Sequence, residues 1–222
     1  MKNREYIEYT YKHRKIVIYL ANKYVKENKE ETMNQIEFHD LDKLYMYLFY
    51  NKKDVSNVHR QLSSHHDNSI EKTDADYVEM VLDWESARYT KPDKPLNAYD
   101  TLYKYYPEMK EKILPILKKF KIDKSGLPME EDVLEYAKSL SNTSIDDIKE
   151  ELKKQIRKLM TEVKGEFSKD NFIKDTYFQV RRLGDKEIFY GIHNWWKGLC
   201  DGEINFVDVV NGEGTVYIAR CK

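Results

Sequence analysis

Apolar residues recur every three or four positions through most of the chain, which is the spacing of one face of an α-helix. The clearest stripe lies in residues 3–28, which we predict to form a long amphipathic helix. Its members include an imidazole as well as larger apolar side chains: Tyr9, His13, Ile16, Leu20 and Tyr24. His13 is therefore expected to point inward with the apolar face.

The same spacing predicts further helices, separated by charge-rich and proline-rich breaks. Residues 28–31 (NKEE) are expected to form a loop or a frayed end, and a second helix to run from 38 or 39 to about 50. Asp74 or Asp76 could cap a third helix that ends near residue 89. After KPDKP, helices are expected over 96–105, from Pro107 through 113–120 with a kink at Pro115, over 129–141 and over 144–167.

From about Thr176 the pattern changes to alternation, which is typical of β-strands. The last two alternating segments, INFVDVV and TVYIARC, flank Asn211-Gly212, a strong hairpin signal because both residues tolerate positive φ. We therefore predict a mainly α fold, α+β overall. Its helical domain would cover residues 1–170, and a small antiparallel β-sheet subdomain would cover residues 171–222.

Composition narrows the classes of partner. The 222 residues include 38 Lys and Arg against 39 Asp and Glu, a net charge of -1, so no global positive field favours nucleic acid. No apolar stretch is long enough to span a membrane, the chain does not begin like a signal peptide, and Cys200 and Cys221 lack metal or disulfide spacing. We expect a cytoplasmic protein. There is also no glycine-rich phosphate loop, GxSxG or dinucleotide fingerprint.

Histidines gather at the start of the chain, and this is the main chemical signal in the sequence. Imidazole and carboxylate together are usual ligands of Fe, Mn, Co and Zn. Asp40 directly follows His39, so the two side chains can reach one cavity. Five of the six histidines lie within the first 66 residues: His13, His39, His59, His65 and His66.

Asp83 adds a carboxylate to this set. It shares a predicted helical stripe with Met80 and Ala87, so it is either exposed at the edge of the stripe or buried with a partner that offsets its charge. We predict that one divalent transition metal is held by His13, His39, Asp40 and Asp83. A second ion, with Asp40 as the bridging carboxylate, would be held by His59, His65 and His66, although residues 59–66 can also be interpreted as a solvated polar loop.

The order of these residues resembles the HD superfamily of helical metal-dependent phosphohydrolases and related dinuclear oxygenases. HDLDKLYMYLFY, HRQLSSHH and EMVLDW are more closely similar to an uncharacterised, often phage-encoded helical family with the patterns HD-x-S-K, H-(x)n-HH and EM-x-x-DW. The resemblance covers about residues 5–90 and implies an HD-like helical bundle. Asp42 departs from the family's usual serine, and the spacing from His59 to His65 is one residue longer than expected.

The resemblance implies a hydrolase that cleaves a phosphoester, in a nucleotide or another small phosphorylated molecule, with one or two bound ions. Asp40 would then be a catalytic metal ligand. Lys43, one helical turn after Asp40, is expected to bind a substrate phosphate or stabilise transition-state charge, unless it is an ordinary surface lysine. His59 is expected to contact the phosphate or carry a proton. A phage origin would place the protein in the host cytoplasm.

Two other classes of function stay open at this point. In the first, the chain is a non-enzymatic interaction protein with a structural or vestigial metal site. Its C-terminal sheet would bind a protein partner through Trp195-Trp196, although these residues also suit the seam between sheet and helices. In the second, the same ligand set serves a dinuclear iron oxygenase. Arg181-Arg182 fits a phosphate contact or the solvent face of a strand.

Overall fold

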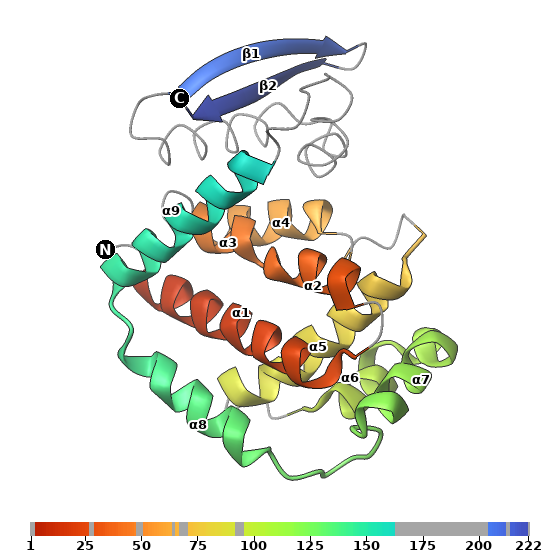
Figure 1. Ribbon diagram of the computed structural model, residues 1–222. Helices are drawn as coiled ribbons and strands as arrows, with labels where there is room; N and C mark the ends of the chain where they lie inside the picture. Colours follow the sequence, from red (N-terminus) through yellow and green to blue (C-terminus); the bar gives the residue numbers. More distant parts are fainter. Residues whose placement is uncertain are drawn as a thin grey trace. The chain divides into compact units, whose positions relative to one another are not determined.

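The computed structural model shows a mainly α-helical protein (Figure 1). It describes residues 3–26, 29–47, 51–63, 65–66, 71–91, 96–162, 204–211 and 214–221. The chain divides into two compact units, the first made of Met1–Leu44 and Ser64–Thr143 and the second of Tyr45–Ser63 and Ser144–Lys222. Each unit has its own elements.

The first unit is a helical assembly built around two long helices that lie side by side, α1 (Arg4–Tyr24) and α5 (Asp74–Thr90) (Figure 1). Helix α2 (Lys29–Glu37) contacts both of them. The chain then continues through α3 (Leu41–Met46), whose last residues belong to the second unit. The remaining elements of the first unit are α6 (Ala98–Tyr105), η1 (Pro107–Met109), α7 (Lys110–Phe120), α8 (Glu131–Ser139) and η2 (Leu140–Asn142).

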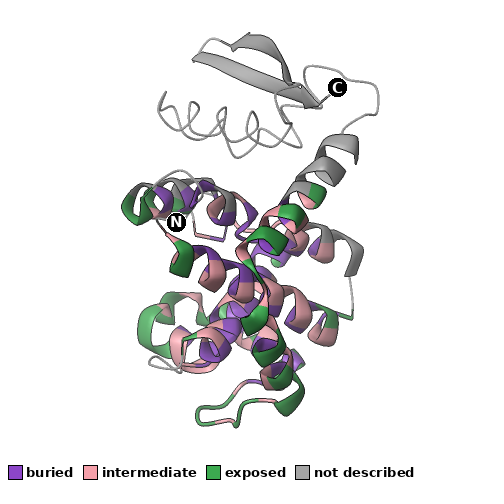
Figure 2. Cartoon of the chain, turned by 90° about the vertical axis from the view of Figure 1, so that its left-hand side faces the viewer, coloured by how far each residue is buried: buried purple, intermediate pink, exposed green. Residues whose placement is uncertain are grey.

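One hydrophobic core joins these helices, and the predicted periodicity explains it. On α7 and α8 the buried and exposed positions fall on different faces, whereas α5 is buried on most sides (Figure 2). Each of five helices contributes at least one fully buried side chain to the core: Leu20, Val81, Leu102, Leu117 and Val133. The polar residues of α5 are thus left to form the site described below, on a helix whose apolar residues fix its position.

A capping box starts α5, and it differs from the predicted cap. The Thr73 hydroxyl accepts a hydrogen bond from the Asp76 amide at 3.2 Å, and the Asp76 carboxylate accepts one from the Thr73 amide at 2.8 Å. The prediction that Asp74 or Asp76 is the cap was therefore wrong. A threonine followed three residues later by a carboxylate satisfies two amides at once, which a single aspartate cap does not.

The segment before His39 also differs from its prediction. Helix α2 begins at Lys29, where a loop was expected, because lysine and glutamate favour helices even without an apolar stripe. The second predicted helix begins later than expected, at Leu41 as α3, because Asp40 has φ 54°, in the left-handed region, and separates α2 from α3. Aspartate adopts this conformation more readily than most residues, so a sharp turn can form at the His39-Asp40 pair.

The second unit contains α4 (Lys52–Leu62), α9 (Ile145–Glu162) and an antiparallel pair of strands, β1 (Ile204–Asn211) and β2 (Gly214–Cys221). In this pair Asn211 is the partner of Gly214. The other predicted strands, and the predicted domain boundary at 170/171, lie outside the described residues, so the small C-terminal sheet and the two-domain division stay predictions. Within the described part of the chain, no helix has the length and apolar character needed to cross a membrane.

Candidate metal centre

The turn at Asp40 directs two neighbouring side chains into the first unit. His39 is 2% exposed and Asp40 is 3% exposed. The Asp40 carbonyl accepts the Leu44 amide at 2.9 Å and so begins α3. The buried Arg14 of α1 donates to the carbonyl of Glu37, the last residue of α2. Helix α1 therefore holds the chain two residues before His39.

Four of the predicted ligands meet at one point. His13 comes from α1, Asp83 from α5, and His39 and Asp40 from the turn between α2 and α3. The His13 Nε2 atom lies 2.8 Å from Asp83 Oδ1 and 3.3 Å from His39 Nε2. The Asp40 Oδ2 atom lies 3.9 Å from His13 Nε2 and 4.0 Å from His39 Nε2. The structure thus brings together the four residues assigned to the first predicted metal site.

Ser86 orients the imidazole of His13. The Ser86 hydroxyl donates its single hydrogen to the Asp83 carbonyl at 2.8 Å, and its oxygen lies 2.9 Å from His13 Nδ1. Since that hydrogen is already used, the serine oxygen accepts from the Nδ1–H group of His13. The Nε2 atom of neutral His13 then presents a lone pair to Asp83 and His39.

Glu79 orients the imidazole of His39 in the same way. Its Oε1 atom lies 2.8 Å from His39 Nδ1 and 3.1 Å from His65 Nδ1, and an ionised carboxylate can only accept hydrogen bonds. The neutral form of His39 therefore carries its hydrogen on Nδ1, and in that form its Nε2 lone pair faces the cluster. The Gln35 amide donates to Glu79 Oε2 at 2.7 Å and to Asp76 Oδ1 at 2.8 Å, which connects Glu79 to the capping box of α5.

Burial and charge shift the pKa values of the cluster in different directions. Burial, the largest effect, lowers the pKa of His13, and the hydrogen bond that the protonated ring can donate to Asp83 acts in the opposite direction. Burial also opposes protonation of His39, but the charges of Asp40, Glu79 and Asp83 outweigh it and raise the pKa of His39. At the two carboxylates burial acts upward, and the neighbouring histidines overcome it, so the pKa values of Glu79 and Asp83 fall well below their usual range.

Lys43 lies beside Asp40, as its spacing predicted. Its Nζ atom is 3.0 Å from Asp40 Oδ2, the same oxygen that faces the two imidazoles. The Lys43 side chain is 20% exposed, whereas that of Asp40 is 2% exposed. Lys43 is therefore the more solvent-accessible member of this pair, and its role toward a substrate stays a prediction.

The remaining histidines belong to different units, so the predicted second site at His59, His65 and His66 stays a prediction. His65 belongs to the first unit and pairs with Glu79, and its ring lies 4.1 Å from the ring of His66. His66 is half-buried, and its charge helps to lower the pKa of Asp83. His59 lies on α4 in the second unit, with its Nδ1 atom 3.3 Å from the Ser63 hydroxyl. The interpretation of residues 59–66 as a solvated loop was wrong for His59 and His65, which are both buried.

Two groups of described residues in the first unit have the spacing needed to hold a metal ion. They are His13–His39–Asp40 and His39–His65–Glu79, and within each group the potential ligand atoms lie within 4.8 Å of one another. The structure thus supports a possible buried metal site. A second ion bridged by Asp40 stays a prediction.

Sequence reasoning missed the residues that orient the ligands. Glu79 precedes Asp83 by four positions and Ser86 follows it by three, so all three share one face of α5. That spacing was a usable signal for Glu79, because a carboxylate one turn before a predicted ligand faces the same cavity. Gln35 had no such signal, since its partners come from a different helix. Trp195-Trp196 and Arg181-Arg182 lie outside the described residues.

Comparisons of the chain with protein-family models, with curated proteins and with solved structures found no match. The resemblance to HD-type proteins therefore stays a prediction, and the functional argument depends on the geometry of the cluster.

Proposed function

We propose that His13, His39, Asp40 and Asp83 bind a divalent transition metal and that the protein is a metal-dependent hydrolase. One observation carries the proposal: the Nε2 atoms of two imidazoles and the carboxylates of Asp40 and Asp83 face one another in a cluster that is buried except at Asp83, which is half-buried. His13 Nε2 and His39 Nε2 are 3.3 Å apart, while the outer Nδ1–H groups are engaged by Ser86 and Glu79. Acceptors packed in this way repel one another unless a proton or a metal ion lies among them.

The donor set fits such an ion. Metal–nitrogen bonds of about 2.0–2.1 Å at a tetrahedral angle place two ligand nitrogens about 3.3 Å apart, which agrees with the separation between the two imidazoles. Mixed imidazole and carboxylate ligands suit Zn, Fe, Mn or Co. The Glu79–His39 pair also matches a common arrangement in which a carboxylate fixes the orientation of a metal-binding histidine.

The proposed reaction is hydrolysis of a phosphoester in a nucleotide or another small phosphorylated molecule. A divalent ion at this site would lower the pKa of a bound water and polarise the phosphoryl group. Lys43 would place a positive charge near the incoming phosphate while it holds Asp40. His66, half-buried and electrostatically coupled to Asp83, would transfer a proton between the site and solvent.

Metal content is the first test. Protein purified without chelator or a histidine tag is compared as wild type, Asp40→Asn and Asp42→Asn by elemental mass spectrometry. Asparagine tolerates the left-handed conformation that Asp40 adopts, so the first variant changes the charge and not the turn. Asp42 lies on the adjacent turn outside the cluster and serves as the control. We expect near-stoichiometric metal in wild type and Asp42→Asn, and little in Asp40→Asn.

Turnover separates a catalytic site from a structural one. Each protein is assayed with p-nitrophenyl phosphate and with nucleoside monophosphates after loading with Zn, Mn, Fe or Co. A hydrolase should lose turnover in Asp40→Asn while the metal-free variant stays folded. Bound metal without turnover on any of these substrates would instead favour a structural site in an interaction protein. A folded wild type that takes up no ion would overturn the proposal.

A further inference from the structure

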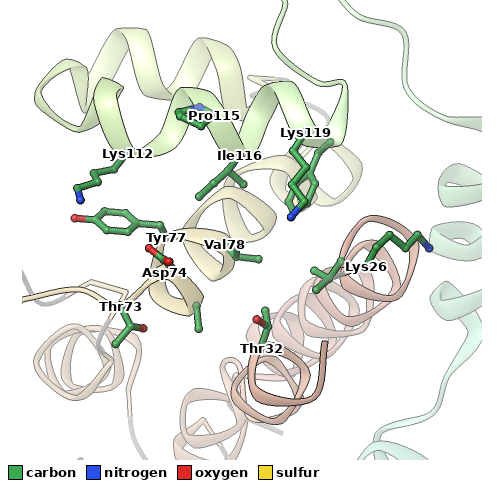
Figure 3. A pocket seen from close by; sticks show the side chains of 13 residues that line it. Lys26, Thr32, Thr73, Asp74, Tyr77, Val78, Lys112, Pro115, Ile116 and Lys119 are labelled. Atoms are coloured by element: carbon green, nitrogen blue, oxygen red, sulfur yellow. The ribbon is translucent and has the colours of Figure 1, made fainter. Parts of the chain in front are cut away.

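A second candidate site lies in a cavity of about 480 Å³ in the first unit. It is bounded by the end of α1, the start of α5 and one face of α7, with a contribution from α2 (Figure 3). None of the four proposed metal ligands lines it. Its volume falls within the range of about 300–1,000 Å³ that is usual for small-molecule sites.

The cavity is positively charged although the chain as a whole is not. Three lysines line it, Lys26, Lys112 and Lys119, against a single carboxylate, that of Asp74. Within the described part of the chain, neither Lys26 nor Lys112 forms an ion pair. Figure 3 shows Lys112 and Lys119 reaching toward the cavity from α7. The three lysines are exposed at the cavity, and an anion that binds there gains attraction from them.

The start of α5 adds hydrogen-bond donors. Asp74 and Ala75 are the first two residues of this 17-residue helix and both line the cavity. Their amides precede the one that Thr73 caps, and they have no hydrogen-bond acceptor among the described residues. Free amides and the dipole at a helix N-terminus favour an anionic group.

Thr32 is an independent sign of a polar ligand. It comes from α2, is only 5% exposed, and lines the cavity opposite α7 (Figure 3). Among the described residues its hydroxyl has no hydrogen-bond partner. The rest of the Thr32 side chain is enclosed by protein, and a ligand oxygen in the cavity can accept a hydrogen bond from its hydroxyl.

The rest of the wall is apolar. Val78, Ile116 and Phe120 line the cavity between the polar groups, and the Phe120 ring stacks on Tyr24 at 5.3 Å. We propose that this cavity binds a small organic anion. Its phosphate or carboxylate lies at the start of α5 near Thr32, and its apolar body packs on Ile116 and Phe120. The proposal does not depend on the metal centre.

The test measures binding by calorimetry and locates it by ¹³C-methyl NMR of the isoleucines. Two anions are titrated, adenosine 5′-monophosphate and decanoate, each beside its neutral parent, adenosine and decanol. We expect one anion to bind at a 1:1 ratio, at least tenfold more tightly than its parent and more weakly at high salt. The methyl signal of Ile116 should shift, while that of Ile113, fully buried on the same helix, should move less.

Three variants decide whether the cavity is responsible. Thr32→Val keeps the shape of the side chain and removes its hydroxyl, and Lys112→Gln removes one charge. Each should weaken binding about tenfold. Lys118→Gln, an exposed lysine of the same helix outside the cavity, should leave the affinity unchanged. Binding of adenosine 5′-monophosphate would indicate a nucleotide-like ligand, and binding of decanoate would indicate a lipid-like one. No binding of either anion, equal binding of the neutral parents, or wild-type affinity in both cavity variants would overturn the proposal.

Discussion

The two imidazoles that face each other in the cluster have different outer partners. Ser86, a neutral acceptor, holds His13, whereas Glu79, an ionised one, holds His39. The pKa values respond in opposite directions, lowered by burial at His13 and raised at His39, where nearby carboxylates outweigh burial. A histidine that donates to a carboxylate is also the more basic metal ligand. We therefore expect His39 to contribute more than His13 to metal affinity.

Replacing Glu79 tests whether its hydrogen bond to His39 supports metal binding. Glu79→Gln keeps the size of the side chain and removes the charge that orients His39 and His65. We expect metal affinity to fall about 10- to 100-fold, measured by titration against a competing chelator. Glu85→Gln is the matched control, because Glu85 is an equally buried carboxylate of α5 that pairs with Arg88 and the Ala98 amide. Equal metal affinity in the two variants would show that Glu79 does not support the site.

The same carboxylates predict how acid affects the metal-free protein. The histidines around Glu79 and Asp83 hold the pKa values of both carboxyls well below their usual range, so their contribution to stability is present above about pH 4.5 and is lost as pH falls. Urea unfolding should show the free energy of unfolding declining below that pH, by up to about 1.4 kcal/mol per pH unit for each carboxyl. Glu79→Gln should decline less steeply.

The contribution of Glu85 to the free energy of unfolding depends on pH in the opposite direction. Its pKa is raised, chiefly by burial, so its contribution is greatest at low pH and is lost as pH rises. Removing that contribution in Glu85→Gln should therefore make the acid decline steeper. A shallower decline in Glu85→Gln than in Glu79→Gln would contradict the assignment of both groups.

Among the helices, α5 does most to build the centre. Glu79, Asp83 and Ser86 follow one another at spacings of four and three, so one face carries a ligand, the acceptor for His39 and the acceptor for His13. The helix is fixed at its start by the capping box, and Gln35 links that box to Glu79. The position of the start of α5 is thus connected to the orientation of His39.

Two threonines at the ends of α5 test the role of the cap. Thr73→Ala removes the cap and should lower the free energy of unfolding by about 1 kcal/mol. Thr90→Ala is the control at the other end, where the hydroxyl makes only long contacts of 3.3 Å to backbone carbonyls, and it should cost less than about 0.5 kcal/mol. Chemical denaturation gives both values, and similar losses in the two variants would contradict a special role for the cap.

Periodicity predicted the helices and the inward face of α1, and the residue types predicted the four-residue cluster. Periodicity did not predict the break at Asp40, because a residue in the left-handed conformation does not change the spacing of the apolar positions. The cap at Thr73 was missed because Asp74 and Asp76 have the same residue preference. Gln35 was out of reach, because its hydrogen bonds to Asp76 and Glu79 depend on how α2 packs on α5.

At the scale of the whole chain, the centre connects segments that are distant in sequence. Its members extend from His13 to Asp83, and all four belong to the first unit. An ion bound by them would link α1, α5 and the turn between α2 and α3. These segments are not held together in the unfolded chain, so the site exists only in the folded state. Binding to the folded state alone must then raise stability in proportion to the logarithm of the metal concentration.

Thermal unfolding measures this linkage. At a free metal concentration about 100 times Kd, the folded state should gain about 2.7 kcal/mol, which for a chain of this size raises Tm by about 5–10 °C. Asp83→Asn should abolish most of the rise, because it removes the carboxylate that lies 2.8 Å from His13 Nε2. Asp42→Asn, outside the cluster, should keep it. An equal rise in both variants would mean that the ion binds elsewhere on the surface, and the same Tm with and without metal in wild type would remove the physical basis for a metal centre here.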